Sequence, residues 1–309
     1  MFEFKFTTLT PLHISNGETL DKDFNYTIHN GKMYKLDPFK VARVIAQKER
    51  PDFSNPINEK NIESWIRKHK LVLIDEASVY SLSYTSFFES DYKNPKALGK
   101  HRIGEFINSS GRFYIPASSV KGALLTILNV DSLGINPNDP VYTDKIVFLD
   151  SDPLSEQSLA VYRTEDRPPA TNLICVKSGT TFSLQMRKTG KFDKASFLSN
   201  LYNYNNIQFT TLQREVAKYK SKKVGNLRKA DLFLKAIEPI IASFNSGKKV
   251  VNIGFGGGSW FKVRKGVIPK FKSKVPGQTQ YEAAHSTYAF PENQGLSHIG
   301  WCELEVIDR

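Results

Sequence analysis

Four glycines within five positions make residues 254–258 the stretch of clearest chemical meaning. They belong to the run Gly254-Phe255-Gly256-Gly257-Gly258-Ser259, which Trp260 and Lys262 follow. Glycine has no Cβ, so its backbone can approach another molecule closely, and successive backbone N–H groups can form an anion site. Aromatic rings stack on bases, and cations neutralise phosphates. The run therefore predicts a contact with nucleic acid.

A second candidate phosphate site lies in the stretch 114–128. Pro116 is followed by Ser118 and Ser119, which predicts a helix that the serines cap. Its apolar positions recur with helical spacing and predict a buried face: Val120, Ala123, Leu124, Ile127 and Leu128. The N–H groups of the first turn, the two hydroxyls and the ammonium of Lys121 would together hold a phosphate. An ordinary capped helix with a solvent-facing lysine is the alternative.

The cations are unevenly distributed along the chain. Its formal net charge is +12, yet residues 1–155 hold 19 Lys and Arg against 19 Asp and Glu, whereas residues 156–309 hold 24 against 12. Six cations fall within residues 218–229, among them Lys222, Lys223 and Arg228. A local excess of positive charge attracts polyanions. A lysine-rich surface that serves solubility is the alternative interpretation.

Other features exclude several classes of protein. Cys175 and Cys302 are the two cysteines of the 309 residues, too few for a disulfide framework and without the spacing of a zinc site. The sequence has neither the phosphate-loop motif GxxxxGK[ST] nor the zinc motif HExxH, so that no cofactor or metal is expected. No apolar stretch reaches the length of a membrane span. We therefore expect a soluble, cytoplasmic protein that makes no contact with a membrane.

The order of elements predicts an α+β fold with a single core, residues 1–309, that carries insertions. Alternating phenylalanines predict a strand at 2–6, and Asn30-Gly31 predicts a tight hairpin turn. Helical patterns in the segment 37–112 suggest a mostly helical insertion. The polar, proline-bearing segment 150–172, with Arg163 and Arg167, is predicted to be either a projecting functional loop or a disordered one. Residues 190–247 are predicted to be largely helical.

Four segments in this order resemble the RAMP superfamily of CRISPR effector proteins, and among its members the fifth subunit of the type III-A Csm complex. They are Thr10-Pro11-Leu12-His13-Ile14, the stretch from Tyr114 to Leu124, Phe148-Leu149-Asp150-Ser151-Asp152, and the stretch from Ile253 to Trp260. The resemblance spans nearly the whole chain. Its most specific parts are the serine-lysine-glycine stretch at 118–122 and the glycine run.

The resemblance implies a ferredoxin-like palm, related to RNA-recognition domains, with inserted helices and with residues 150–172 as a thumb. It implies a non-catalytic subunit for antiviral defence that binds crRNA, caps the 3′ end of the guide and aids crRNA maturation. Implied partners are crRNA, target RNA, other Csm subunits, especially the filament RAMP subunit, and host nucleases. The expected RNA-binding residues are His13, Ser118, Ser119, Lys121, Arg163, Arg167, Lys222, Lys223, Arg228, Gly254, Gly256, Gly257, Gly258, Ser259, Trp260 and Lys262.

Catalytic alternatives remain open at this point. Asp21 and Asp23 fall near the position at which the related filament subunits carry the aspartate for metal-dependent RNA cleavage, so the chain could be a RAMP endoribonuclease that acts on target or precursor RNA. His13 could serve as a general base in RNA processing. Against these, Asp23 begins a predicted strand, Asp21 lies beside Lys22 as an ordinary turn acid would, and His13 lies between Leu12 and Ile14 as a structural histidine would. A purely structural adaptor is a third alternative.

Overall fold

The computed structural model describes residues 1–50, 59–93, 101–128, 146–164, 172–188, 193–222, 227–254, 289–292 and 295–309. The sequence favours one core with insertions, whereas the chain divides into two compact units. Unit 1 comprises residues 1–14, 114–153 and 176–309, and unit 2 comprises residues 15–113 and 154–175. The chain therefore crosses from one unit to the other four times. No helix among these described residues is long and apolar enough to cross a lipid bilayer.

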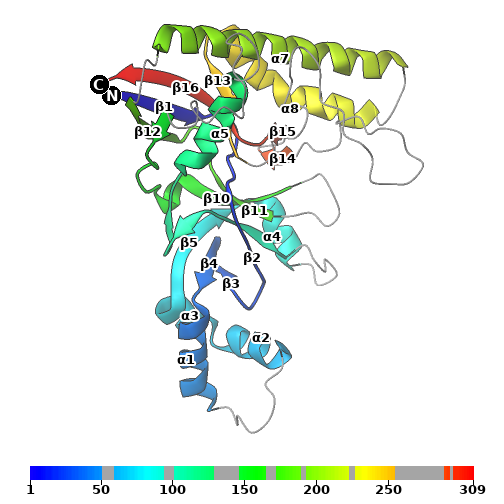
Figure 1. Ribbon diagram of the computed structural model, residues 1–309. Helices are drawn as coiled ribbons and strands as arrows, with labels where there is room; N and C mark the ends of the chain where they lie inside the picture. The colour runs from blue at the N-terminus through cyan, green and yellow to red at the C-terminus, as the bar shows by residue number, and fades with distance from the viewer. Residues whose placement is uncertain are drawn as a thin grey trace, which may run out of the picture. The chain divides into compact units, whose positions relative to one another are not determined.

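Unit 1 is built on a five-stranded antiparallel sheet with the strand order β13-β16-β1-β12-β9. Its strands are β1 (Phe2–Thr8), β9 (Ile146–Phe148), β12 (Thr181–Lys188), β13 (Val250–Asn252) and β16 (Trp301–Asp308). The first and last strands pair over their whole lengths, so both chain ends lie at the same end of the sheet (Figure 1). β13, which leads into the glycine-rich run, pairs with β16 and is therefore held by this sheet.

Alternation along β1 explains which face of this sheet is buried. Phe4 and Phe6 are buried, while Glu3 and Lys5 are partly exposed, as the sequence predicts for this strand. The ring of Phe4 makes edge contacts with Phe148 of β9, at a centroid distance of 4.9 Å, and with Phe197. Burial of such rings contributes on the order of 2 kcal/mol each. Phe197 belongs to α7 (Lys194–Lys222), so these ring contacts pack that helix against the sheet.

Helices α5 (Ala117–Leu128), α7 (Lys194–Lys222) and α8 (Leu227–Asn245) complete unit 1, with the hairpin of β14 (Ala289–Glu292) and β15 (Gly295–His298). The long helices α7 and α8 run side by side (Figure 1). Both fall within the region 190–247 for which helices are predicted. α8 ends at Asn245, and Gly247 follows with a φ of +88°, the left-handed conformation that often ends a helix.

Unit 2 is built on a seven-stranded mixed sheet with the strand order β2-β6-β11-β10-β5-β4-β3. Its strands are β2 (Ser15–Leu20), β3 (Tyr26–His29), β4 (Lys32–Leu36), β5 (Ser78–Tyr84), β6 (Ile103–Phe106), β10 (Leu159–Arg163) and β11 (Asn172–Val176). The turn between β3 and β4 has Asn30 at φ +45° and Gly31 at φ +73°. Two successive positive φ values define the type I′ turn, so the predicted hairpin is confirmed.

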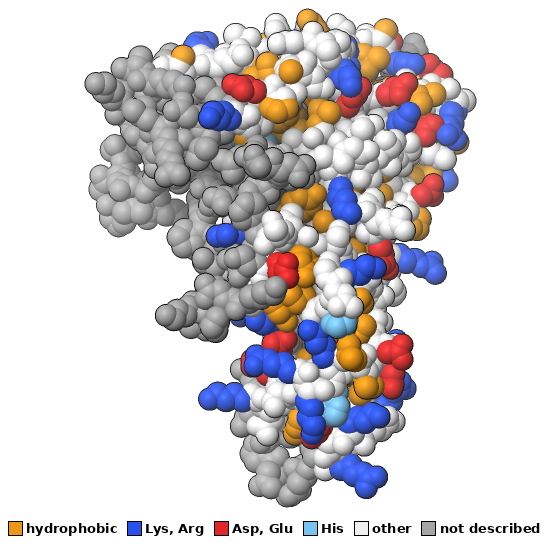
Figure 2. All heavy atoms as spheres, turned by 180° about the vertical axis from the view of Figure 1, so that it is seen from behind, with side chains coloured by type: hydrophobic (Ala, Val, Ile, Leu, Met, Phe, Trp, Pro, Cys, Tyr) orange, Lys and Arg blue, Asp and Glu red, His pale blue; other side chains and the backbone are white. Residues whose placement is uncertain are grey.

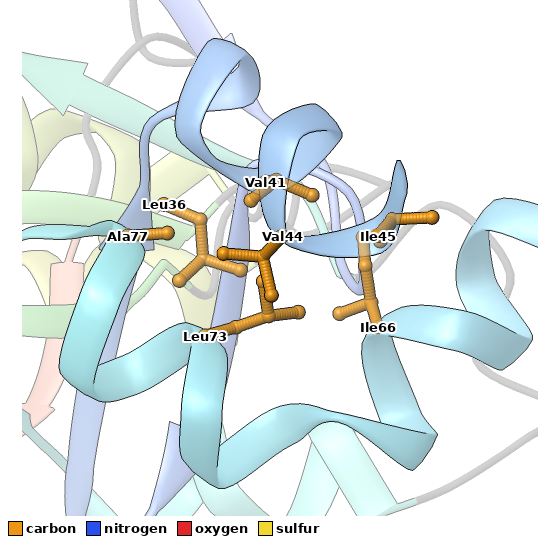
Figure 3. Packing of buried hydrophobic residues seen from close by; sticks show 7 residues of the cluster. All are labelled: Leu36, Val41, Val44, Ile45, Ile66, Leu73 and Ala77. Atoms are coloured by element: carbon orange, nitrogen blue, oxygen red, sulfur yellow. The ribbon is translucent and has the colours of Figure 1, made fainter. Parts of the chain in front are cut away.

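Three helices of unit 2 form a small apolar cluster on one side of β4. They are α1 (Pro38–Glu49), α2 (Glu59–Lys68) and α3 (Lys70–Ala77). The carboxylate of Asp37 accepts hydrogen bonds from the N–H groups of Phe39 and Lys40, so α1 begins where the sequence predicts. Figure 3 shows the buried side chains of the cluster pointing toward one another. They are Leu36, Val41, Val44, Ile45, Ile66, Leu73 and Ala77.

Two regions differ from the sequence-based predictions. The segment 37–112 contains α1 to α3 and α4 (Ser86–Lys93), but also strands β5, β6, β7 (Asn108–Ser109) and β8 (Arg112–Phe113), so it is mixed and not mostly helical. β5 has the sequence SVYSLSY, with only two aliphatic side chains. The alternation of apolar and polar residues that indicates a strand is therefore weak there. The prediction of a projecting loop is wrong at β10, which lies inside the sheet because its side chains from Leu159 to Tyr162 are apolar and buried.

Candidate nucleic-acid interface

The first glycine of the glycine-rich run is fixed by packing against the backbone of His13 and the side chain of Ile14. Gly254 follows β13 and has a φ of +75°. A Cβ added there would lie 2.4 Å from the carbonyl oxygen of His13 and 2.9 Å from Cγ1 of Ile14. Real Cβ atoms do not approach other atoms so closely, so only glycine fits both the conformation and the space. The glycine therefore has a structural role in addition to any role in binding.

A second glycine, Gly300, packs against Ile253, the residue that precedes Gly254. Gly300 has a φ of +86°, and its added Cβ would lie 2.3 Å from the carbonyl oxygen of Ile253. Its N–H donates to the carbonyl of Pro11 at 2.7 Å, and its own carbonyl accepts from the N–H of Ile253 at 2.7 Å. The side-chain amide of Asn252 donates to the carbonyl of Ile299 at 2.9 Å. Residues 10–14, 252–254 and 299–301 thus form one interlocked base, called the glycine base below.

The glycine base holds the N-terminal end of the glycine-rich region, and the β14–β15 hairpin follows that region along the chain. β13 delivers the chain into Gly254, and the β14–β15 hairpin receives it again at Ala289. The remaining predicted RNA-binding residues of this region lie outside the described residues: Gly256, Gly257, Gly258, Ser259, Trp260 and Lys262. The structure thus explains how the run is anchored, and its contact with RNA stays a prediction.

The second predicted phosphate site is altered by an acidic neighbour. α5 begins at Ala117, so Ser118 and Ser119 lie inside its first turn, and the prediction that they precede and cap the helix is wrong. The N–H of Ala117 donates to the carboxylate of Asp150 at 2.7 Å, and the N–H of Ser119 donates to the carbonyl of Pro116 at 3.1 Å. Asp150 follows β9 and is 33 residues away along the chain, which is why the spacing of the helix alone did not reveal it.

This arrangement changes what the start of α5 can bind. An anion at a helix N-terminus interacts with the free N–H groups there, and Asp150 already places a negative carboxylate at that position. Ser118 is exposed, and Ser119 and Lys121 are partly exposed. Val120 and Leu124 are buried, as predicted for the apolar face of the helix. A phosphate would therefore have to be bound by the side chains of the first turn and not by its backbone.

His13 is placed differently from the predicted RNA contact. Only 1% of its surface is exposed, and its neighbours Leu12 and Ile14 are buried as well. The N–H of Leu12 donates to the carbonyl of Val176 at 3.0 Å, and the N–H of Val176 donates back at 2.8 Å. An imidazole so enclosed cannot reach the ribose of a bound strand. The burial disfavours both the RNA contact and the general base proposed for His13.

The predicted cations of the long helices and of the segment 150–172 occupy separate parts of the fold. Lys222 is the last residue of α7 and Arg228 is the second residue of α8, so both lie on the helical pair of unit 1. Lys223 lies outside the described residues. Arg163 ends β10 in unit 2 and is partly exposed, and Arg167 lies outside the described residues. The structure assigns Arg163 to a different unit from Ser118, Lys121 and Gly254.

The two aspartates considered for metal-dependent cleavage are already engaged. Asp23 is 3% exposed, and its carboxylate accepts from Nε of Arg67 at 2.9 Å and from the hydroxyl of Tyr92 at 3.1 Å. Its hydrogen bond to Arg67 raises the pKa of that guanidinium. Asp21 accepts from Nε of Arg102 at 2.9 Å. The buried carboxylate of Asp23 already accepts two hydrogen bonds, and Asp21 is paired with an exposed arginine, so the geometry disfavours a metal at these positions.

Lys22, which lies between the two aspartates, takes part in the same network. Its ammonium donates to the carbonyl of Tyr92 at 2.7 Å and lies 3.9 Å from the centre of the Tyr92 ring. Burial lowers the pKa of this ammonium. Within the described residues no group of three or more His, Cys, Asp or Glu side chains is arranged to hold a metal ion. Sequence reasoning missed Arg67 and Tyr92 because they follow Asp23 by 44 and 69 residues.

Comparison with known sequences identifies related proteins. The family described as "RAMP superfamily" matches residues 5–262. The protein named "CRISPR system Cms protein Csm5" from Streptococcus thermophilus is 33% identical over 144 residues, and that from Methanocaldococcus jannaschii is 28% identical over 130 residues. The alignments cover 41% and 40% of this chain. They span only 37% and 29% of the lengths of the two relatives.

Comparison with solved structures extends the likeness to the whole fold. One chain of "Cryo-EM structure of Csm-crRNA-target RNA ternary complex in type III-A CRISPR-Cas system" superposes with a TM-score of 0.62, covering 99% of this chain and 100% of that chain. The crystal structure of T. onnurineus Csm5 superposes with a TM-score of 0.56, covering 97% and 99%. Both are 16% identical in sequence, so the likeness is one of fold.

Proposed function

Since this chain belongs to the RAMP superfamily and resembles Csm5 of type III-A CRISPR complexes, we propose that it is a non-catalytic, crRNA-binding subunit of a Csm effector complex. It would hold the 3′ part of the guide and aid crRNA maturation. Its partners would be crRNA, target RNA, neighbouring Csm subunits and host nucleases. The observation that carries the proposal is the superposition of nearly the whole chain on one chain of a Csm–crRNA–target RNA complex.

The antiparallel sheet of unit 1 would act as a ferredoxin-like palm in this proposal. The glycine base fixes Gly254 at the edge of that sheet, and the glycine-rich run would continue from it toward the RNA backbone. Glycine backbones, Trp260 and Lys262 suit a strand that is held through its phosphates and bases without readout of sequence. Lys222 at the end of α7, Arg228 near the start of α8, and Lys223 would add to the same positive field.

The non-catalytic part of the proposal is supported by the paired state of the candidate aspartates. Asp23 is enclosed by Arg67 and Tyr92, and Asp21 is bonded to Arg102. A carboxylate that activates a metal-bound nucleophile must keep oxygen lone pairs open to the metal and its water. The alternative of a RAMP endoribonuclease has no comparable support among the described residues.

Lys121 provides the test of the proposed RNA site on α5. Lys121→Ala is expected to lower the amount of crRNA that copurifies with the assembled complex, or to leave longer guides, because one phosphate contact is lost. Lys121 is the fifth residue of α5 and is partly exposed, so the fold should be unchanged. Gel analysis and mass measurement of the copurified RNA report both quantities.

Lys5→Ala is the matched control for this test. It removes the same charge from unit 1, on β1, at a lysine paired with Glu305 at 3.6 Å. Guide length and amount should stay at the wild-type level in this control. Normal guides in Lys121→Ala, with normal assembly, would refute an RNA contact at this position.

A further inference from the structure

The outer face of α1 carries an exposed aromatic ring among exposed cations. We define the α1 face as Phe39, Lys40, Arg43 and Arg50. All four residues are exposed, and Phe39, at 88%, is the most exposed large apolar side chain of the described residues. Phe39 and Arg43 are four residues apart and share one side of the helix, Lys40 follows Phe39 directly, and Arg50 follows the last helical residue. An exposed ring at the start of the helix thus lies beside two cations, with a third at the end of the helix.

The opposite side of α1 holds this face outward. Val41, Val44 and Ile45 pack against Leu73 of α3 and Ile66 of α2 (Figure 3). Asp37 caps the first turn, and Arg50 ends the helix with a left-handed conformation. Turning the helix would expose this cluster to water at a cost of about 2 kcal/mol for each large side chain. The α1 face is therefore a fixed part of the surface of unit 2.

The charge of the α1 face is not neutralised locally. None of its three cations forms an ion pair with another of the described residues. The nearby acids are engaged elsewhere, since Glu49 pairs with Lys68 at 2.8 Å and with His69, and Asp37 caps the helix. Figure 2 shows Lys and Arg side chains gathered over the end of unit 2 that holds α1, α2 and α3. This local excess lies within residues 1–155, where cations and acids are equal in number.

We propose that the α1 face binds the sugar–phosphate backbone of single-stranded RNA, with Phe39 stacking on an unpaired base. Unpaired cations spaced along a helix complement a chain of phosphates. An exposed ring is stabilised by a base, and bases are available for stacking only in a single strand. An acidic protein surface would satisfy the cations but would not explain a phenylalanine left almost wholly in water. The surface belongs to unit 2 and does not involve the glycine base, so it goes beyond the proposed function.

The test measures binding of a fluorescent oligouridylate to the full-length chain as a function of salt. Each phosphate contact with a single strand adds about 0.7 to the slope of log affinity against log salt. Lys40→Gln with Arg43→Gln should therefore reduce that slope by about 1.4. Phe39→Ala should weaken binding by about fivefold or more through the lost base contact. Glutamine keeps the helix propensity close to that of the replaced residues, so folding should be unaffected.

A matched control neutralises two other exposed cations of unit 2, with Lys32→Gln and Arg112→Gln. Neither cation forms an ion pair with another described residue, and neither belongs to α1. Equal slopes for the α1 variant and this control would overturn the proposal. So would an unchanged slope together with weaker assembly of the complex, since that result would identify an acidic protein partner. A reduced salt slope in the α1 variant together with normal RNA retention in Lys121→Ala would support the α1 face and refute the α5 site. The two proposals can therefore fail separately.

Discussion

The glycine base in unit 1 and the α1 face in unit 2 differ in how their residues are constrained. At the glycine base, backbone atoms touch so closely that Gly254 and Gly300 have no room for a side chain. On the α1 face, the side chains project into solvent and nothing in their own unit fixes their identity. The first region is therefore sensitive to any added atom, whereas the second should tolerate substitution without loss of stability. Gly254 and Gly300 are therefore best tested by unfolding measurements, and the α1 face by RNA-binding measurements.

The strongest test of this contrast is Gly254→Ala. The positive φ and the close approach to His13 should together reduce the free energy of unfolding by about 2–4 kcal/mol. Urea unfolding, followed through tryptophan fluorescence, to which the buried Trp301 of unit 1 contributes, measures the change. The same treatment of the α1 variants should leave the unfolding free energy within about 0.5 kcal/mol of the wild type.

Two glycines of unit 1 serve as matched controls for Gly254→Ala. Gly247 has a φ of +88° with nothing within 4 Å of an added Cβ, so Gly247→Ala should lose only about 1 kcal/mol through backbone strain. Gly122 lies in α5, also with open space, and Gly122→Ala should gain about 0.5–1 kcal/mol. If Gly254→Ala proved no more harmful than Gly247→Ala, the close packing of the glycine base would be disproved.

The next largest effect is expected at the buried aspartate of unit 2. Asp23→Ala removes the acceptor of both Arg67 and Tyr92 and places alanine at a φ of +53°. The unfolding free energy should fall by about 2 kcal/mol. Asp23→Asn should fall less, because asparagine tolerates this conformation and keeps one acceptor oxygen. Denaturant unfolding of the three proteins measures the order.

Asp21 provides the exposed counterpart of Asp23. Asp21→Asn, whose partner Arg102 is also exposed, should change the unfolding free energy by less than about 1 kcal/mol. Assembled complexes that carry Asp21→Asn together with Asp23→Asn should cut target RNA at the wild-type rate. A lost cut in a complex that assembles normally would reinstate the nuclease alternative.

A smaller, pH-dependent effect is expected at Glu105 of β6. Burial acts to raise the pKa of this carboxyl, but hydrogen bonds from Lys35, Asn16 and Tyr80 outweigh it, so that the pKa lies below its ordinary value of 4.5. A carboxyl with a lowered pKa stabilises the fold above the pKa of the unfolded chain. This stabilisation is lost as the pH falls below 4.5 toward the pKa of the folded state.

The variant Glu105→Gln tests that linkage. It should be less stable than the wild type at neutral pH, and it should lose less of its remaining stability on acidification. Glu305→Gln is the control, since it removes one carboxylate from an exposed ion pair. Urea unfolding at neutral pH and below pH 4.5 supplies the comparison. Equal losses on acidification in Glu105→Gln and the wild type would exclude a stabilising role for the ionised carboxylate.

Local patterns in the sequence were sufficient for several elements of the fold. The alternation at Phe4 and Phe6, the Asn30-Gly31 turn and the Asp37-Pro38 helix start each depend on residues next to one another, and the structure confirms them. The resemblance to RAMP proteins also came from short motifs, and the family match confirms it. Local rules thus predicted the hairpin, the helix start and the family.

Contacts between distant segments could not be predicted in the same way. The carboxylate of Asp150 at the start of α5, the partners of Asp23 and the burial of His13 all depend on residues far along the chain. The charge count of residues 1–155 also gave no sign of the α1 face. Cations and acids are equal in number there, but the acids near the α1 face are engaged with other groups. Division of the chain into two units was missed because four crossings join segments that look continuous in sequence.

Crosslinking of RNA to protein in the reconstituted Csm assembly tests the central claim most directly. After ultraviolet irradiation and proteolysis, mass spectrometry identifies the peptides that carry a guide nucleotide. The account predicts crosslinked peptides from this chain that include residues 254–262 or the start of α5, with the nucleotide in the 3′ part of the guide. An assembly that contains this chain and the guide, yet yields crosslinks on other subunits alone, would contradict it.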